Sequence, residues 1–276
     1  MKKMIFAVVA ALMTLGASAQ GSFQTVKENG YTLHVYNSND AMGDASYIIE
    51  TSNGLLTMEE PLFKSGVAEF NAYLSKLGKP VTARIVDYHE GGTGSNTVIQ
   101  AQGMHKFMHE GAYDAMMKGF QKNFGDKMVD LPTGNAVEVN FGSTISVESV
   151  NYQFNDGAKN DFPGSSILIG GKYVLMHWAP AKAHMNSLQL ANREAVSLAL
   201  EGLKAAKATG AQYFLGCHGG LADSDALNFR IGYLEKVEQL VNDNKDAKHF
   251  VTALKKAYPG LPGENGLEAL AQTLYK

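Results

Sequence analysis

Runs typical of β-strands and of amphipathic helices alternate twice along this chain, and their order constrains the fold more than any other feature. In the first half, three β-type runs joined by tight turns precede a helical segment and a further β-type run, at residues 31–36, 45–51, 54–58, 64–77 and 81–86. The helical segment has apolar residues three and four positions apart and is followed by Gly78 and Pro80. A helix that leads directly into a strand predicts a βαβ unit.

The second half repeats this order. Strands are predicted at residues 136–139, 144–154 and 166–176, a long helix at about 187–209, a strand at 212–215, and closing helices at 231–241, 247–257 and 266–275. Such alternation favours β-sheets that are covered by helices on their outer faces. Because no low-complexity linker divides the chain, we expect one domain over residues 20–276, with C-terminal helices from about residue 231.

The first nineteen residues have the pattern of a secretory signal peptide. Lys2 and Lys3 precede an apolar run over residues 4–15, and the small residues Ala17 to Ala19 follow. This run is shorter than the roughly 20 apolar residues that span a bilayer, and no later run is long enough. We therefore expect cleavage after Ala19 and an exported chain, periplasmic or secreted, with no transmembrane segment.

Charge and cysteine content narrow the classes of partner. The formal net charge is −3, and charges of both signs are interspersed, so the chain has neither a basic footprint for nucleic acid nor a polybasic patch for lipid. Cys217 is the only cysteine, which excludes an intramolecular disulfide. A small-molecule ligand or substrate is the expected partner, and the sequence does not identify a protein partner.

One histidine stands where the strand at residues 81–86 runs into a glycine-rich turn. The local sequence is Asp87-Tyr-His-Glu-Gly-Gly-Thr-Gly94, with His89 as the single imidazole. The turn is not a phosphate-binding P-loop, because no lysine follows its glycines at the required spacing. The chemistry of this region therefore depends on which other residues join His89.

Three stretches together resemble the metallo-β-lactamase superfamily. Residues 45–58 resemble its opening hairpin, the helix from Lys64 followed by Leu77-Gly-Lys-Pro-Val81 resembles the approach to its metal loop, and Gly210-Ala-Gln-Tyr-Phe-Leu-Gly-Cys-His-Gly-Gly220 resembles its late strand ending in Gly-His-Gly. The resemblance covers about residues 30–235. It implies an α/β (α+β) fold of four αββα layers, with two sheets face to face, helices outside, and metals at one edge of the sheets.

The metal motif that this family carries is mostly absent. The family strand ends in H-x-H-x-D-H, and here His89 matches either its first or its last histidine, depending on the register. The family's middle histidine falls near residues 157–163, where only Asp156, Asn160 and Asp161 offer ligands. His177 stands where the family usually has a bridging aspartate. The resemblance therefore implies too few ligands for two metal ions.

Four histidines nevertheless close or follow predicted strands at the end where this fold builds its site: His89, His177, His184 and His218. Three imidazoles suffice for one zinc ion, with Glu90, Asp161 or water completing the site and Glu90 or Asp161 as the general base of a hydrolase. The alternative, which the degenerate motif favours, is a non-catalytic binding protein whose histidines are hydrogen-bonded remnants in a pocket without metal.

Two other features have simpler interpretations. His105 and His109 have the i, i+4 spacing of a helical zinc pair, but residues 106–109 are predicted to form a strand, so a structural or surface role is expected. Cys217 and His218 are adjacent on a predicted strand and would point to opposite faces. Cys217 is therefore predicted to be a buried structural thiol.

Overall fold

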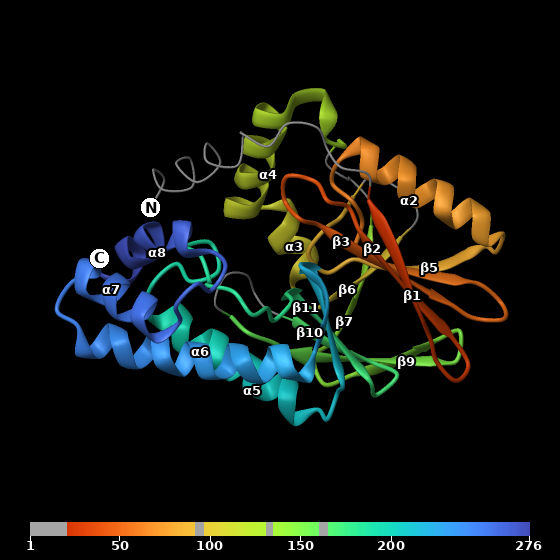
Figure 1. Ribbon diagram of the computed structural model, residues 1–276. Helices are drawn as coiled ribbons and strands as arrows, with labels where there is room; N and C mark the ends of the chain where they lie inside the picture. The colour runs from red at the N-terminus through yellow and green to blue at the C-terminus, as the bar shows by residue number, and fades with distance from the viewer. Residues whose placement is uncertain (1–20, 92–96, 131–134, 160–164) are drawn as a thin grey trace. The chain divides into compact units, whose positions relative to one another are not determined.

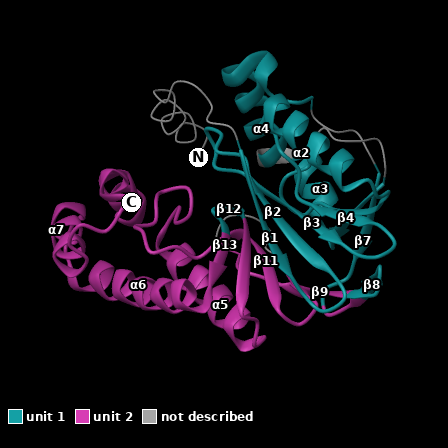
Figure 2. Cartoon of the chain, turned by 45° about the vertical axis from the view of Figure 1, so that its right-hand side comes forward, with its two compact units in different colours: residues 1–141, 145–150, 217–220 teal, residues 142–144, 151–216, 221–276 magenta. Residues whose placement is uncertain are grey.

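The computed structural model describes residues 21–91, 97–130, 135–159 and 165–276. It divides into two compact units (Figure 2): unit 1 comprises residues 1–141, 145–150 and 217–220, and unit 2 comprises residues 142–144, 151–216 and 221–276. The predicted signal peptide lies outside the described residues. The assignment of residues 20–276 to one domain stays a prediction. No helix in the described part of the chain is long and apolar enough to cross a membrane.

A seven-stranded sheet forms the framework of unit 1 (Figure 1). Its strands, in spatial order, are β1 (Ser22–Lys27), β2 (Thr32–Asn37), β3 (Ala45–Glu50), β4 (Leu55–Met58), β5 (Val81–Ile85), β6 (Val98–Ala101) and β7 (Ala136–Val139). Strands β1 to β4 pair antiparallel, whereas β4 to β7 pair parallel. The change occurs because the helix between β4 and β5 returns the chain to the same end of the sheet.

That helix is α2 (Lys64–Leu77), with the bounds that the sequence predicted. Phe70 on α2 is fully buried against Tyr36, Ile48 and Leu55, which fixes the helix on the sheet. Gly78 ends the helix in the left-handed region at φ 67°, and its N–H caps the Leu74 carbonyl. The remaining helices of unit 1 are α3 (Met104–His109), α4 (Gly111–Phe124) and the short η2 (Gly125–Lys127).

A six-stranded sheet forms the second framework, in the order β13-β12-β11-β10-β9-β8. Its strands are β8 (Thr144–Val147), β9 (Val150–Asp156), β10 (Ser165–Ile169), β11 (Tyr173–Trp178), β12 (Tyr213–His218) and β13 (Gly220–Asp223). The helices of unit 2 are α5 (Arg193–Ala208), α6 (Ser224–Asp243), α7 (Ala247–Ala257), η3 (Glu264–Gly266) and α8 (Leu267–Leu274). Their apolar faces share a core that includes Phe214, Leu234, Phe250 and Leu270, each fully buried.

Two predicted strands prove to be hairpins. The run over residues 144–154 turns at Glu148 and Ser149, which adopt positive φ angles of 50° and 66°. The run over residues 166–176 turns at Gly170 and Gly171, also with positive φ. In both cases a tight turn leaves the alternation of apolar side chains nearly intact, so periodicity alone did not reveal the reversal.

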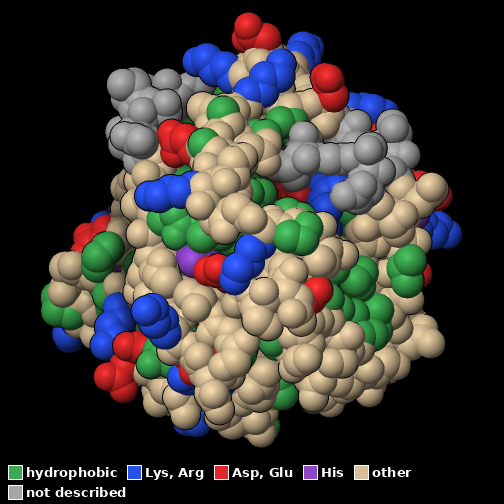
Figure 3. Space-filling view, turned by 90° about the vertical axis from the view of Figure 1, so that its right-hand side faces the viewer, with side chains coloured by type: hydrophobic (Ala, Val, Ile, Leu, Met, Phe, Trp, Pro, Cys, Tyr) green, Lys and Arg blue, Asp and Glu red, His purple; other side chains and the backbone are tan. Residues whose placement is uncertain are grey.

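Two further predictions are corrected at helices. Residues 106–109, predicted as a strand, belong to helix α3, which begins after Gly103 at φ 81°. Helix α6 begins at Ser224, seven residues before the predicted start, because the Asp223 side chain accepts the Ala226 N–H and caps it. On the face shown in Figure 3, lysine and arginine side chains alternate with aspartate and glutamate, as the sequence indicated.

Removal of a core side chain tests the packing of unit 2. We expect Leu234→Ala to lower the free energy of unfolding by about 2–5 kcal/mol, because it leaves a cavity at a fully buried position. The matched control is Leu188→Ala, whose side chain is 42% exposed and whose loss should cost under about 0.5 kcal/mol. Urea denaturation measures both, and equal losses would contradict the assignment of the core.

Candidate metal centre

The carboxylate of Glu59 holds the loop that follows β5. It accepts the backbone N–H groups of Asp87 at 2.8 Å, Tyr88 at 3.1 Å and His89 at 2.6 Å. Glu59 is fully buried and follows β4 directly, in the left-handed region at φ 53°. Since β4 and β5 are parallel neighbours, the two strands end side by side, and the acid after one can bind the loop after the other. His89 is thereby fixed in position.

Neighbouring groups hold the same loop. The Glu60 N–H donates to the His89 carbonyl at 3.0 Å, and the Tyr113 hydroxyl donates to the Tyr88 carbonyl at 2.7 Å. Arg84 forms a bidentate ion pair with Glu60, in which Nε lies 2.7 Å from Oε1. Gly91 is required by close approach, because a Cβ there would lie 2.3 Å from the Pro61 carbonyl oxygen.

Burial shifts the pKa values of the acidic groups around this loop far from their ordinary values. Desolvation, reinforced by the charge of Asp87, raises the pKa of Glu59 to about 8. Desolvation also raises the pKa of Asp87 to about 7, although the Ala101 N–H stabilises its ionised form. The thiol of Cys217 is fully buried, and burial together with Glu59 raises its pKa well above the ordinary value. This confirms Cys217 as a buried thiol and argues against a reactive thiolate.

His89 and His218 face each other across Asp44. His218 ends β12, and its backbone forms an isolated antiparallel bridge with Asp44. The Nδ1 atom of His218 lies 3.3 Å from Asp44 Oδ1, and the Nδ1 atom of His89 lies 3.7 Å from the same oxygen. The two rings are 4.5 Å apart between centroids and inclined at 68°. Two imidazoles far apart in sequence therefore share one carboxylate.

Asp44 is itself almost fully buried, at 1% exposure. Desolvation raises its pKa to about 6, and the nearby His218 partly offsets this rise. The ring of His218 and the backbone N–H of Leu62 favour its ionised form, and His89 lies close to the same carboxylate. A buried carboxylate beside two imidazoles creates a local field that favours a cation.

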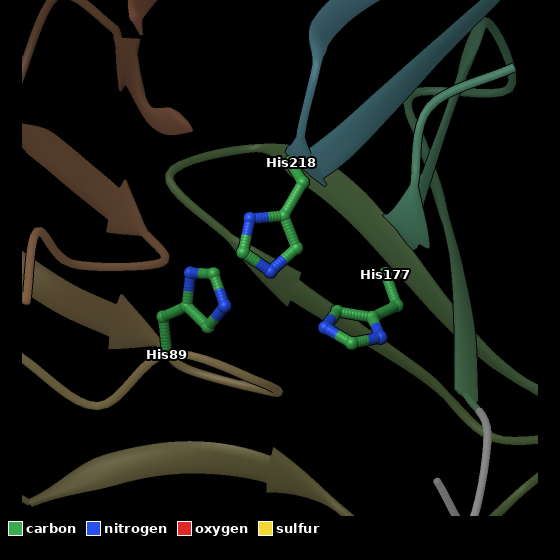
Figure 4. A group of neighbouring side chains, drawn as sticks. All are labelled: His89, His177 and His218. Carbon is green, nitrogen blue, oxygen red and sulfur yellow. The ribbon is translucent and has the colours of Figure 1, made fainter. Parts of the chain in front are cut away.

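A third imidazole completes the group. His177 lies near the end of β11, the neighbour of β12 in the second sheet. One ring nitrogen from each of His89, His177 and His218 lies within 4.8 Å of the other two, and all three residues are buried. Figure 4 shows the three rings turned toward a common centre. Because the Nδ1 atoms of His89 and His218 face Asp44, their Nε2 atoms lie on the side of each ring away from this carboxylate.

The other predicted site residues have different surroundings. The Nδ1 atom of His184 lies 3.1 Å from the Tyr233 hydroxyl, and His184 is not a member of the three-histidine group. Glu90 is buried, and its Oε2 atom lies 3.0 Å from His109 Nε2. Asp161 lies outside the described residues. Of the predicted residues in the described part of the chain, the structure thus brings together His89, His177 and His218.

Sequence reasoning missed three acids that shape this site: Asp44, Glu59 and Asp87. Asp44 lies in a turn-rich segment that offered no signal. Glu59 did have a sequence signal, because two acids directly after a fully buried strand are unusual. His105 and His109 were assigned to a strand, but on helix α3 their ring centroids lie 4.5 Å apart with the planes inclined at 42°, and His109 contacts Glu90.

No protein-family model matches this sequence, and no curated protein is significantly similar to it. Solved structures are similar in fold. DIM-1 metallo-β-lactamase exposed to ceftazidime is 11% identical with a TM-score of 0.51, covering 80% of this chain and 99% of the other. A flavo di-iron protein variant from Thermotoga maritima is 11% identical with a TM-score of 0.54, covering 91% and 78%.

An archaeal metallo-β-lactamase superfamily protein from Sulfolobus tokodaii is 12% identical with a TM-score of 0.51, covering 79% of this chain and 86% of the other. These likenesses confirm the predicted fold class, the four-layer αββα sandwich of the metallo-β-lactamase type. At such identities they establish the fold alone, so the chemistry must be argued from the residues of this chain.

Truncation of Glu59 tests its hold on the loop. We expect Glu59→Ala to lower the free energy of unfolding by about 3 kcal/mol or more, because three buried N–H groups lose their acceptor. The amide protons of Asp87, Tyr88 and His89 should also exchange faster in NMR measurements. Glu201→Ala, at an exposed position of α5, is the control and should have neither effect. Unchanged exchange in Glu59→Ala would contradict this role.

Proposed function

We propose that this protein binds one zinc ion through His89, His177 and His218 and hydrolyses a small-molecule ester, amide or phosphoester. The observation that carries the proposal is the contact of Asp44 with the Nδ1 atoms of both His89 and His218. Metal-binding histidines usually direct their second ring nitrogen to a carboxylate or carbonyl, which fixes the ring and its tautomer. Here the Met42 carbonyl, 3.1 Å from His218 Nδ1, does this for His218, and the Asp44 carboxylate lies beside the Nδ1 atoms of both rings.

The donor set fits the ion. Neutral imidazoles suit zinc, and catalytic zinc sites typically use three protein ligands and leave a fourth position open. The three histidines are buried, so the protein could exclude bulk water from the ligand atoms. Asp44, with its pKa raised by burial, would be stabilised in its ionised form by a nearby divalent cation. When bound, zinc lowers the pKa of a coordinated water toward about 7.

The chain's own residues would orient the ligands and handle protons. Asp44 is a positioning residue, since it acts through the rings of His89 and His218. Glu59 positions His89 through the backbone. Glu90 remains the proposed general base, and its contact with His109 Nε2 offers a place to hold the proton it accepts. Asp161 is proposed as a base on sequence grounds alone.

The fold neighbours support a metal centre without selecting a reaction. Their names include a metallo-β-lactamase and a flavo di-iron protein, so proteins of this fold carry different metals and activities. The competing proposal is a non-catalytic binding protein. Gly91, the loss of the H-x-H-x-D-H pattern and the burial of the acids favour it, and metal content with activity decides between them.

Metal content tests the three-histidine centre. Protein expressed with excess zinc and then dialysed should retain about one equivalent, measured by inductively coupled plasma mass spectrometry. His89→Ala and His218→Ala should each retain less than a tenth of that amount, because each removes a ligand. His249→Ala, at an exposed position on α7, should retain the full amount. We expect His184→Ala to retain it as well, because His184 contacts Tyr233 instead.

Activity separates the two functions. The zinc-loaded protein should hydrolyse at least one chromogenic ester, amide or phosphoester, and chelation should abolish the rate. Zinc retention without hydrolysis of any of the three classes would favour the binding protein. Failure to retain stoichiometric zinc, iron or another transition metal would overturn the metal centre.

We further propose that the chain is exported. The support is the Lys2-Lys3 start, the apolar run and the Ala17-Ser-Ala19 end of the first nineteen residues. Expression of the full chain in a Gram-negative host should yield a periplasmic protein whose N-terminus is Gln20, identified by mass spectrometry. Replacing two residues of the apolar run with arginine should leave the uncleaved chain in the cytoplasm. Cytoplasmic, uncleaved wild-type chain would contradict export.

A further inference from the structure

Arg230 is a buried cation without a counter-charge among the described residues. It lies on α6 and is 4% exposed, and its Nη1 atom has no hydrogen-bond partner in the described part of the chain. No described carboxylate forms an ion pair with it. Its neighbour is the ring of Tyr233, 5.6 Å from the guanidinium carbon. Burying a guanidinium without a counter-charge destabilises a fold, and an anion bound at this position would offset that cost.

His184 presents a second unused donor beside the same tyrosine. Its Nδ1 atom lies 3.1 Å from the Tyr233 hydroxyl oxygen, which also accepts the Met185 N–H at 3.3 Å. In the tautomer whose Nδ1 accepts the hydroxyl proton, the ring proton lies on Nε2. Burial lowers the pKa of His184, which favours the neutral ring. The Nε2 atom is buried and has no hydrogen-bond partner among the described residues.

Aromatic rings surround these two donors. Tyr258 and Phe229 are partly exposed and lie with centroids 5.2 Å and 6.3 Å from Tyr233, respectively. The other charged groups near His184 are Glu264 and Lys255, whose charged atoms lie 3.8 Å apart. The cluster therefore offers two donors, one net positive charge from Arg230, and apolar ring surface that reaches the solvent.

We propose that Arg230 and His184 bind the carboxylate of a small aromatic carboxylic acid, whose ring packs on the partly exposed rings of Tyr258 and Phe229. The planar guanidinium matches a carboxylate with two parallel hydrogen bonds, and the neutral His184 Nε2–H supplies a third donor. A single fixed positive charge suits a monoanion better than a phosphate dianion. This site goes beyond the zinc centre and shares no residue with it.

Isothermal titration calorimetry with benzoate and benzamide tests this site. The full-length mature protein, dialysed free of metal and chelator, should bind benzoate saturably, whereas the neutral isostere benzamide should bind at least tenfold more weakly. Arg230→Gln should weaken benzoate binding at least tenfold. Arg230→Lys should also weaken it, because lysine keeps the charge but loses the paired hydrogen bonds. His184→Gln should have a smaller effect.

Two control variants distinguish benzoate binding at Arg230 from binding elsewhere on the protein. Arg193→Gln removes an arginine that packs on the ring of Tyr275, 4.9 Å away, and it should leave benzoate binding unchanged. His89→Ala should also leave it unchanged, which distinguishes this site from carboxylate binding at a metal. Melting temperatures identify any variant that fails to fold, in which case the benzoate and benzamide comparison on the wild-type protein decides.

Equal binding of benzoate and benzamide, or unchanged benzoate binding in a folded Arg230→Gln variant, would overturn the proposal. Inorganic phosphate or sulfate that displaces benzoate and binds more tightly would overturn the assignment to a carboxylate. Loss of benzoate binding in His89→Ala would place the anion at the metal centre and contradict this site.

Discussion

The hydrogen bonds from the Asp87–His89 backbone to Glu59 are the interaction on which the candidate centre depends. A loop that leaves a parallel strand has no partner strand for its N–H groups, and here one buried carboxyl group accepts three of them. A hydrogen bond to a carboxyl group contributes about 0.5–1.5 kcal/mol when the group is neutral and about 1.5–3 kcal/mol when it is ionised, so these three bonds offset part of the desolvation of Glu59. The raised pKa of Glu59 shows that this compensation is incomplete.

Asp44 contacts two imidazoles that come from distant parts of the chain and helps to orient them. His89 follows β5 and His218 ends β12, so neither local sequence determines the ring of the other. The Asp44 carboxylate lies beside both Nδ1 atoms, and the Met42 carbonyl also contacts that of His218, which restricts the ring orientations. A centre of this kind does not need the clustered H-x-H-x-D-H ligands, because orientation comes from a shared acid rather than from one rigid loop.

Each unit also keeps a buried charge that its own side chains compensate poorly. In unit 1 this is Asp44, whose partners are imidazoles, and in unit 2 it is Arg230, whose partner is the Tyr233 ring. Such groups lower stability, and a bound ligand of opposite charge would offset that cost. The two proposed ligands match these charges, with a cation beside Asp44 and an anion beside Arg230. His184, an expected metal ligand, belongs by its contacts to the second group.

The sequence by itself determined the elements and the fold class. Helix α2 was predicted to the residue because its apolar spacing and its Gly78 cap are local signals, and the β-type runs located most strands. The sequence-based prediction missed the turns of the β8–β9 and β10–β11 hairpins and helix α3, because short segments there keep the same apolar pattern whether or not the chain turns or forms a helix. His89, His177 and His218 were candidates because each lies at or near a strand end. Only the tertiary structure decided that these three converge and that Asp44 joins His89 to His218, whereas His184 pairs with Tyr233. The physical reason is that periodicity reports the local backbone, whereas a site depends on contacts between residues far apart in the chain.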